Sequence, residues 1–154
     1  MQLKNGLTKV LTNSLDNEYG CIYDSVKTRI YECNRNRVIV VTKEYPKYLY
    51  YRYGLEHNFQ HIPRIDDLIK DDINGVFIIK REELFPITNT NKLTRLEIIK
   101  NALLESVCIN DKIVEEAMKF NARTKCHFKL DFGPHCFMQT KNNKIVISDL
   151  FMER

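Results

Sequence analysis

The chain has 154 residues, of which 24 are Lys or Arg and 20 are Asp or Glu, and its formal net charge is +4. A hydrophobic content of 44% with 29% charged residues is ordinary for one globular domain, and no apolar run approaches the roughly 18 residues of a membrane span. The mild positive charge neither requires nor excludes a nucleic-acid partner. The five cysteines form no C-x-x-C pair and the first residues lack the apolar core of a signal peptide, so we expect reduced thiols and a cytoplasmic location.

The first part of the chain carries the pattern of a helix followed by strands. Apolar residues at helical spacing predict a short helix over residues 3–15, which the polar residues 16–20 end. From residue 21 to residue 42 the pattern predicts strands, with a turn at 34–36 before the apolar run 38–41.

The next stretch, residues 44–54, is rich in tyrosine. Pro46 is suited to the first turn of a helix, which we expect over residues 47–53. The tyrosines have two interpretations. We favour packing of a small helix onto the sheet, because buried aromatic side chains mostly form cores. With Lys47 and Arg52 they also fit a stacking surface for nucleic acid.

Residues 76–79 predict a strand that leaves into a charged segment, and two helices are expected after it. Leu96, Ile99, Leu103 and Val107 fall on one face of the first helix. The second helix is predicted over residues 113–120, behind a cap at Asn110–Asp111. Their apolar stripes are assigned to the core.

The stretch from residue 129 to residue 150 carries the chemistry. Apolar residues 137–138 and 145–147 flank the polar turn 141–144, which is the pattern of a β-hairpin. Asp131 precedes the hairpin and Asp149 ends it, 18 residues later (149 − 131). A hairpin between the two aspartates is expected to bring their carboxylates close together at one cleft.

This stretch resembles the catalytic loop of protein kinases, H-R-D-L-x-x-x-N, with Asp131 at the place of its aspartate and Asp149 at the D-F-G aspartate. More narrowly, it is similar to short kinase-like proteins of bacteriophages, which carry D-x-H-x-x-N-x-M, then I-V-I-x-D, and earlier H-[IL]-P-[RK]-[IV], matched here by residues 61–65. The resemblance implies an α+β fold of truncated kinase-like type in a single domain, residues 1–154. It has a small antiparallel sheet lobe to about residue 85 and, over about residues 92–154, helices with a catalytic-type hairpin.

The resemblance also implies roles for particular residues. Asp131 is the expected base and Asp149 the expected Mg²⁺ ligand. Lys43 is the nearest candidate for the lysine that contacts phosphate, although a solvated strand end is the commoner role for such a residue. The remaining nucleotide-binding positions are expected at Glu83, Leu84 and Phe85, for the base pocket. Gly20 is expected where the phosphate loop should lie, but one glycine does not make such a loop.

The sequence departs from the family at Gly133, which replaces a histidine, and at Cys136, which replaces the metal-binding asparagine. A glycine-rich loop is missing, and few residues follow Asp149, so we expect no substrate platform. The departures favour a pseudokinase that binds a host or viral macromolecule in the host cytoplasm. The alternatives are an active minimal phosphotransferase that uses ATP and Mg²⁺, and a small nucleic-acid-binding phage protein. A homodimer also stays open.

Two further hypotheses concern the cysteines and histidines. Cys126, His127, His135 and Cys136 could form a zinc site, but adjacent Cys-His pairs do not easily point at one tetrahedral ion. A nucleophilic dyad of Cys136 with His135 is disfavoured, since neighbours on an extended loop point to opposite sides.

Overall fold

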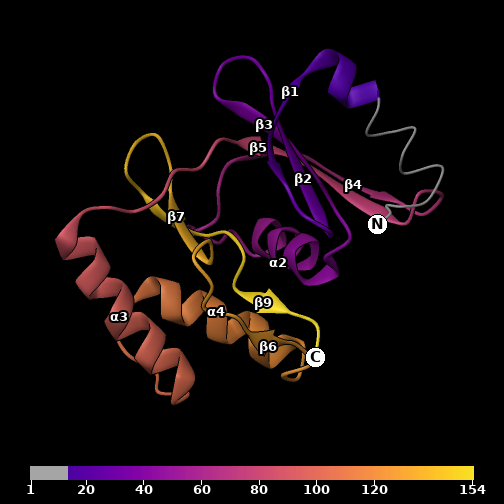
Figure 1. Cartoon of the computed structure of the whole chain (residues 1–154). Helices are drawn as coiled ribbons and strands as arrows, with labels where there is room; N and C mark the ends of the chain where they lie inside the picture. The colour runs from indigo at the N-terminus through magenta and orange to yellow at the C-terminus, as the bar shows by residue number, and fades with distance from the viewer. Residues whose placement is uncertain (1–13) are drawn as a thin grey trace. The chain divides into compact units, whose positions relative to one another are not determined.

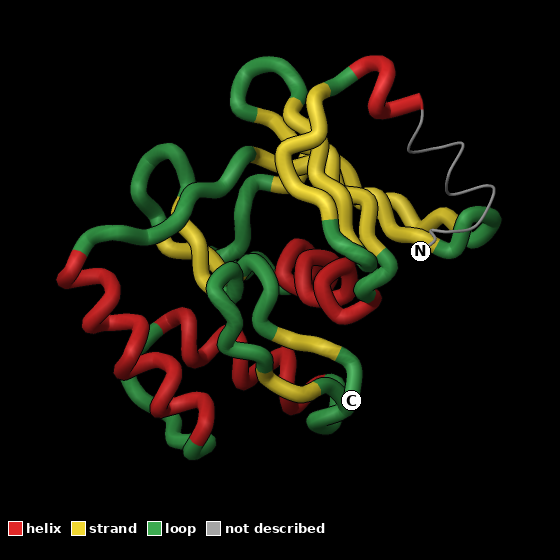
Figure 2. Tube along the Cα trace, in the orientation of Figure 1, coloured by secondary structure: helices red, strands yellow, loops and turns green. Residues whose placement is uncertain are grey.

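The structure is a computed structural model that describes residues 14–154 (Figures 1 and 2). The described residues divide into two compact units, one formed by residues 14–48 with Arg64–Glu83 and the other by Leu49–Pro63 with Leu84–Arg154. The helix predicted over residues 3–15 lies mostly outside the described residues. The described part of the chain begins with a helical segment, residues 14–18. The α+β class predicted from the sequence is confirmed by a five-stranded antiparallel sheet and the helices described below.

The first unit is built around the five-stranded sheet (Figure 1). Its strands are β1 (Gly20–Asp24), β2 (Thr28–Glu32), β3 (Arg37–Thr42), β4 (Ile65–Asp71) and β5 (Val76–Glu82). They lie in the order β1-β2-β3-β5-β4, and all neighbours are antiparallel. The turn predicted at 34–36 joins β2 to β3, and Arg35 and Asn36 adopt the left-handed conformation there, with φ of 62° and 60°. Asparagine tolerates this conformation better than most residues.

The two faces of this sheet follow from the period-two alternation of side chains along each strand. One face carries a core cluster of Tyr31, Ile39, Val41 and Val76, against which Leu15, Tyr19, Cys33 and Ile78 pack. The opposite face carries Phe77, which pairs with Thr42 across the strands. Tyr45 and Tyr48 of helix α2 (Tyr45–Glu56) lie against Phe77, with ring centroids 5.6 and 4.6 Å away.

The tyrosine-rich stretch therefore belongs mainly to the core. Tyr48, Tyr50 and Tyr51 are all buried. In the second unit Tyr50 packs against Phe120 and Phe151, with centroids 4.9 and 5.4 Å away. These contacts confirm the packing interpretation and leave few of the tyrosine rings for stacking on nucleic acid.

The expected place of Gly20 at the phosphate loop is wrong. Gly20 opens β1 and pairs with Glu32 near the end of β2 that is distant from the β1–β2 turn. The turn itself is Ser25–Val26–Lys27, closed by a hydrogen bond from Ser25 N–H to the Thr28 carbonyl. The residues between the first two strands thus include no glycine, because the sequence signal of Gly20 marked a strand start and not a turn.

The second unit contains two longer helices and four short strands. These are α3 (Thr90–Leu104), α4 (Lys112–Arg123), β6 (Lys129–Leu130), β7 (Phe137–Gln139), β8 (Ile145–Ile147) and β9 (Phe151–Met152). Asp111 caps α4 as predicted, and its carboxylate accepts a hydrogen bond from Ile113 N–H. None of the helices in the described part of the chain has the length and apolar character needed to cross a lipid bilayer.

Val107 was expected on the buried face of the first of these helices, and this is wrong. α3 ends at Leu104, and Val107 is exposed. The end is a Schellman motif: Ser106 is left-handed, with φ of 54°, and Val107 N–H donates to the Ala102 carbonyl at 2.9 Å. The apolar periodicity continues past the residue at which the backbone turns away.

Candidate functional site

The predicted β-hairpin is present in the second unit. β7 pairs antiparallel with β8 through Phe137 with Ile147, Met138 with Val146 and Gln139 with Ile145. The turn at 141–144 is closed by a hydrogen bond from Thr140 N–H to the Lys144 carbonyl. All of β8 is buried, so the hairpin is anchored in the core of its unit.

A second, two-residue pairing lies at the base of the hairpin. Lys129 pairs with Met152 and Leu130 with Phe151, which joins β6 to β9. The next hydrogen bond runs from Asp131 N–H to the Leu150 carbonyl at 2.7 Å. The backbone of Asp131 therefore lies beside the residue that follows Asp149, although the two aspartates are far apart in sequence.

The loop between β6 and β7 is tied to the end of β8 as well. The Cys136 carbonyl accepts hydrogen bonds from Ser148 N–H at 2.9 Å and from Asp149 N–H at 3.3 Å. Asp131 is exposed and Asp149 is half-buried. The loop and the end of the hairpin thus form one hydrogen-bonded assembly that carries both carboxylates.

The residues that depart from the family motif lie within this assembly. A Cβ at Gly133 would lie 3.5 Å from Asp131 Oδ1, an ordinary van der Waals contact, so the space beside the carboxylate accepts a Cβ atom. The Cys136 side chain is buried, and this burial raises the pKa of its thiol. A buried, protonated thiol is a poor ligand for Mg²⁺, which prefers oxygen.

The sequence did not reveal Glu116, a buried carboxylate in α4 that holds the segment leading to β4. Its oxygens accept hydrogen bonds from the backbone N–H groups of Gln60 at 2.6 Å and His61 at 3.0 Å. The His61 carbonyl in turn accepts from Ile147 N–H in β8, at 2.9 Å. Glu116 therefore supports the hairpin through one intervening residue. Its signal was a charged residue on the otherwise apolar face of the predicted helix.

The electrostatics of Glu116 follow from these contacts. Burial acts to raise the pKa of the carboxyl group, but hydrogen bonds from His61 and from the Gln60 backbone outweigh it, and the pKa lies below its ordinary value. The His61 ring supports the negative charge, with Nδ1 3.7 Å from Glu116 Oε1. Glu116 is thus an ionised carboxylate with a structural role, since it holds the backbone of residues 60–61. The His61 ring lies beside it and also has a structural role.

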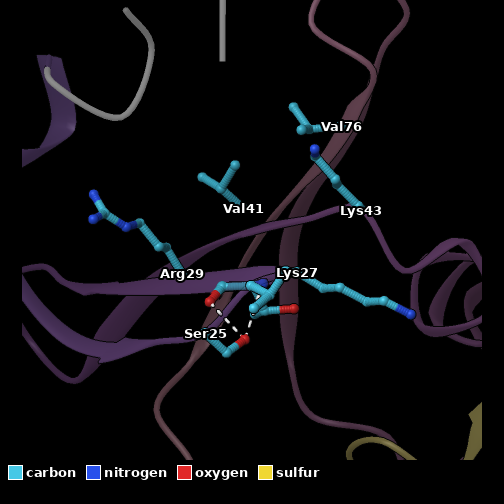
Figure 3. A pocket seen from close by; sticks show the side chains of 8 residues that line it. Ser25, Lys27, Arg29, Val41, Lys43 and Val76 are labelled. Atoms are coloured by element: carbon cyan, nitrogen blue, oxygen red, sulfur yellow. Dashed lines mark hydrogen bonds between the residues drawn. The ribbon is translucent and has the colours of Figure 1, made fainter. Parts of the chain in front are cut away.

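Lys43, the expected phosphate contact, lies at the end of β3 in the first unit. It lines a small recess together with Val41, Val76 and Arg29 (Figure 3). Its own N–H donates to the Lys27 carbonyl at 2.9 Å. Lys43 thus lies on the Val41 side of the sheet, whereas Tyr45 and Tyr48, at the start of α2, pack on the opposite face against Phe77.

Two of the three residues expected to line a base pocket, Glu83 and Phe85, have backbone groups that are already hydrogen-bonded. Glu83 N–H donates to the Asn36 carbonyl at 2.9 Å. Phe85 exchanges two hydrogen bonds with Gln139, its N–H donating at 2.8 Å and its carbonyl accepting at 2.9 Å. Leu84 is half-buried between them. Adenine recognition by such a segment depends on backbone donors and acceptors, and those of Phe85 are already used within its own unit.

The zinc hypothesis is wrong. Among residues 14–154, which include Cys126, His127, His135 and Cys136, no group of three or more His, Cys, Asp or Glu side chains is placed to hold a metal ion. His135 is exposed and Cys136 is buried, so the two side chains point to different environments, as expected for neighbours on a loop.

Comparison with known proteins identifies no family for this chain, since neither the family models nor the curated proteins compared with it give a match.

Proposed function

We propose that this chain is a kinase-like protein that has lost phosphoryl transfer and acts by binding a host or viral macromolecule. The observation that carries the proposal is the hydrogen bond from Asp131 N–H to the Leu150 carbonyl, with the β7–β8 hairpin between the two residues. This bond supports the proposal because it brings the backbone of the expected base beside the residue that follows the expected metal ligand, and both residues must act on one nucleotide.

The order of the elements supports the kinase-like part. Three strands are followed by helix α2, two more strands, helices α3 and α4, and then the loop and hairpin with their aspartates. Kinases place the phosphate-binding lysine on the third strand, a helix after it, and the catalytic loop after the helices of the second lobe. The strands, helices and hairpin follow in that order here, whereas Lys43 comes directly after β3 and lies on the Val41 side of the sheet.

Four local features support the loss of catalysis. The β1–β2 turn contains no glycine, and the loop asparagine is replaced by the buried Cys136. The Phe85 backbone is engaged with Gln139. In α2 the sole carboxylate is Glu56, which pairs with Arg52 at 3.4 Å, whereas an active kinase pairs a glutamate of this helix with the phosphate-binding lysine. Each missing contact typically costs orders of magnitude in rate.

The alternative is an active minimal phosphotransferase, with Asp131 as base and Asp149 as Mg²⁺ ligand. The exposure of Asp131 favours it, since a base must reach the substrate hydroxyl.

Thermal unfolding with and without ATP and Mg²⁺ separates the two functions. Ligand at about 100 times its dissociation constant stabilises a protein by about 2.7 kcal/mol, which for a domain of this size raises Tm by about 5 °C or more. We expect no rise of that size. A rise that Asp149→Asn abolishes would favour nucleotide binding, and phosphate transfer from radiolabelled ATP that Asp131→Ala abolishes would establish the enzyme. Asp72→Asn, the same change at an 81% exposed side chain, is the matched control.

The binding part of the proposal is tested by affinity capture from lysate of the host, with the full chain as bait. A partner retained equally by the wild type and by the Asp131→Ala/Asp149→Asn variant is expected for a protein that binds without catalysis. Failure of both baits to retain any partner would contradict this part of the proposal.

A further inference from the structure

Strand β1 is an edge strand with unusual exposure. All five of its residues are exposed. Among the described strands, its hydrogen-bonded neighbour is β2, and its other side faces no strand. Ile22 is 50% and Tyr23 40% exposed, and Val26, in the turn that follows, is 74% exposed. An exposed strand edge with apolar side chains is a template for pairing with another strand.

The other edge of the same sheet is protected in the usual way. β4 carries the exposed charged residues Asp66, Asp67 and Lys70. In β1 there is no lysine and no proline, and its one charge, Asp24, is neutralised by Arg29 at 2.9 Å. Within residues 14–154, the protective feature that β1 shows is a bulge at Ile22. The two edges therefore differ in their capacity to accept another strand.

The charges around β1 identify the strand that fits. Lys27 lies five residues beyond Ile22 at one end, and Glu18 lies four residues before it at the other (27 − 22 and 22 − 18). Glu32 lies beside Gly20, at the same end as Glu18. Lys27, Glu18 and Glu32 are exposed, and none of them has an ion-pair partner within residues 14–154.

Antiparallel pairing of β1 with a copy of itself satisfies this pattern. A two-fold axis near Ile22 brings the Lys27 end of each copy beside the Glu18 end of the other, so that opposite charges meet twice. It also places Ile22 of both copies at the centre of the contact. A two-fold contact of this kind uses the same patch on both molecules.

We propose that a second copy of this chain binds at β1, through antiparallel pairing of the two edge strands, and that the two sheets become one. This interaction does not depend on the kinase-like interpretation. A five-residue strand pair is smaller than a standard interface, so the dimer is weak and forms in the micromolar range or above.

The test is sedimentation equilibrium of the full chain from about 1 µM to about 1 mM. We expect a monomer–dimer equilibrium that Ile22→Lys weakens at least tenfold, while Ile73→Lys, the same change at an 80% exposed residue in the β4–β5 turn, leaves it unchanged. Lys27→Glu should weaken the dimer, and Lys27→Glu with Glu18→Lys should restore it. Both sites are exposed, and circular dichroism confirms that each variant is folded.

Amide hydrogen exchange supplies an independent measurement. Protection of residues 21–24 should increase with protein concentration, because the outer backbone groups of β1 gain partners only in the dimer. A chain that stays monomeric throughout the range overturns the proposal, as does a dimer that Ile22→Lys does not weaken. High protection at every concentration of the amides in residues 21–24 that point away from β2 also overturns it, because the outer edge would then be covered within one chain.

Discussion

Replacement of Glu116 by alanine is expected to destabilise the protein strongly. The carboxylate is buried and accepts hydrogen bonds from the backbone N–H groups of Gln60 and His61, at 2.6 and 3.0 Å. Alanine leaves both donors without a partner, and each unsatisfied buried donor costs about 1–3 kcal/mol. The expected loss is therefore about 4 kcal/mol, which is a large part of the 5–15 kcal/mol that stabilises a typical domain.

Urea denaturation followed by circular dichroism measures this loss. Glu116→Gln should fall between the wild type and Glu116→Ala, because the amide oxygen still accepts from one N–H while its NH₂ group faces the other. Glu115→Ala is the matched control: its side chain is 45% exposed and pairs with Lys112 at 3.9 Å, so its effect should stay within about 0.5 kcal/mol.

The same residue predicts a dependence of stability on pH. The pKa of Glu116 is lower in the folded protein than its ordinary value, so the unfolded chain binds the proton more tightly. The stabilisation is complete above the ordinary pKa of a glutamate and is lost as the pH falls through the lower pKa of the folded state. The wild type should therefore lose more stability than Glu116→Gln between about pH 5 and pH 3.

Two results would refute this reasoning. If Glu116→Ala and Glu115→Ala unfold at the same urea concentration, the buried carboxylate does not anchor the backbone of residues 60–61. If the wild type and Glu116→Gln lose stability equally in acid, the charge of Glu116 is not favoured by folding.

Two further substitutions test contacts that flank the site. Tyr51→Phe removes the hydrogen bond from the buried hydroxyl to the Ser148 carbonyl, 3.1 Å away, and should lower the free energy of unfolding by about 1 kcal/mol, because the carbonyl loses its donor. Asp111→Ala removes the cap of α4 and should cost about 1 kcal/mol by urea denaturation, whereas Ala at the exposed neighbour Asn110 should cost much less. Equal effects at Asp111 and Asn110 would show that the cap contributes nothing.

Hydrogen bonds to other segments hold the hairpin and the loop before it in place, although the strand pairing at its base is short. The β6–β9 pairing is two residues long on each side and would not be stable alone. It is supported by the buried strand β8 and by the chain of contacts from Glu116 through His61 to Ile147. The loop that carries Asp131 is therefore supported by a buried carboxylate of the preceding helix, α4.

Much of the secondary structure was determined by the sequence, because the signals that specify it are local. The apolar run 38–41 predicted β3, and Asp111 predicted the start of α4. The hairpin at β7 and β8 followed from two apolar runs around a polar turn. Each of these signals acts over a few residues through hydrogen bonds or burial of one face.

The tertiary structure alone decided which groups these elements bring together and which backbone groups are already hydrogen-bonded within the protein. Nothing near Phe85 in the sequence indicates that its N–H and carbonyl bind Gln139, and the face on which Lys43 lies depends on the pairing of β3 with β2 and β5. Such contacts are set by the register and packing of distant segments, which the local pattern of one strand or helix does not encode.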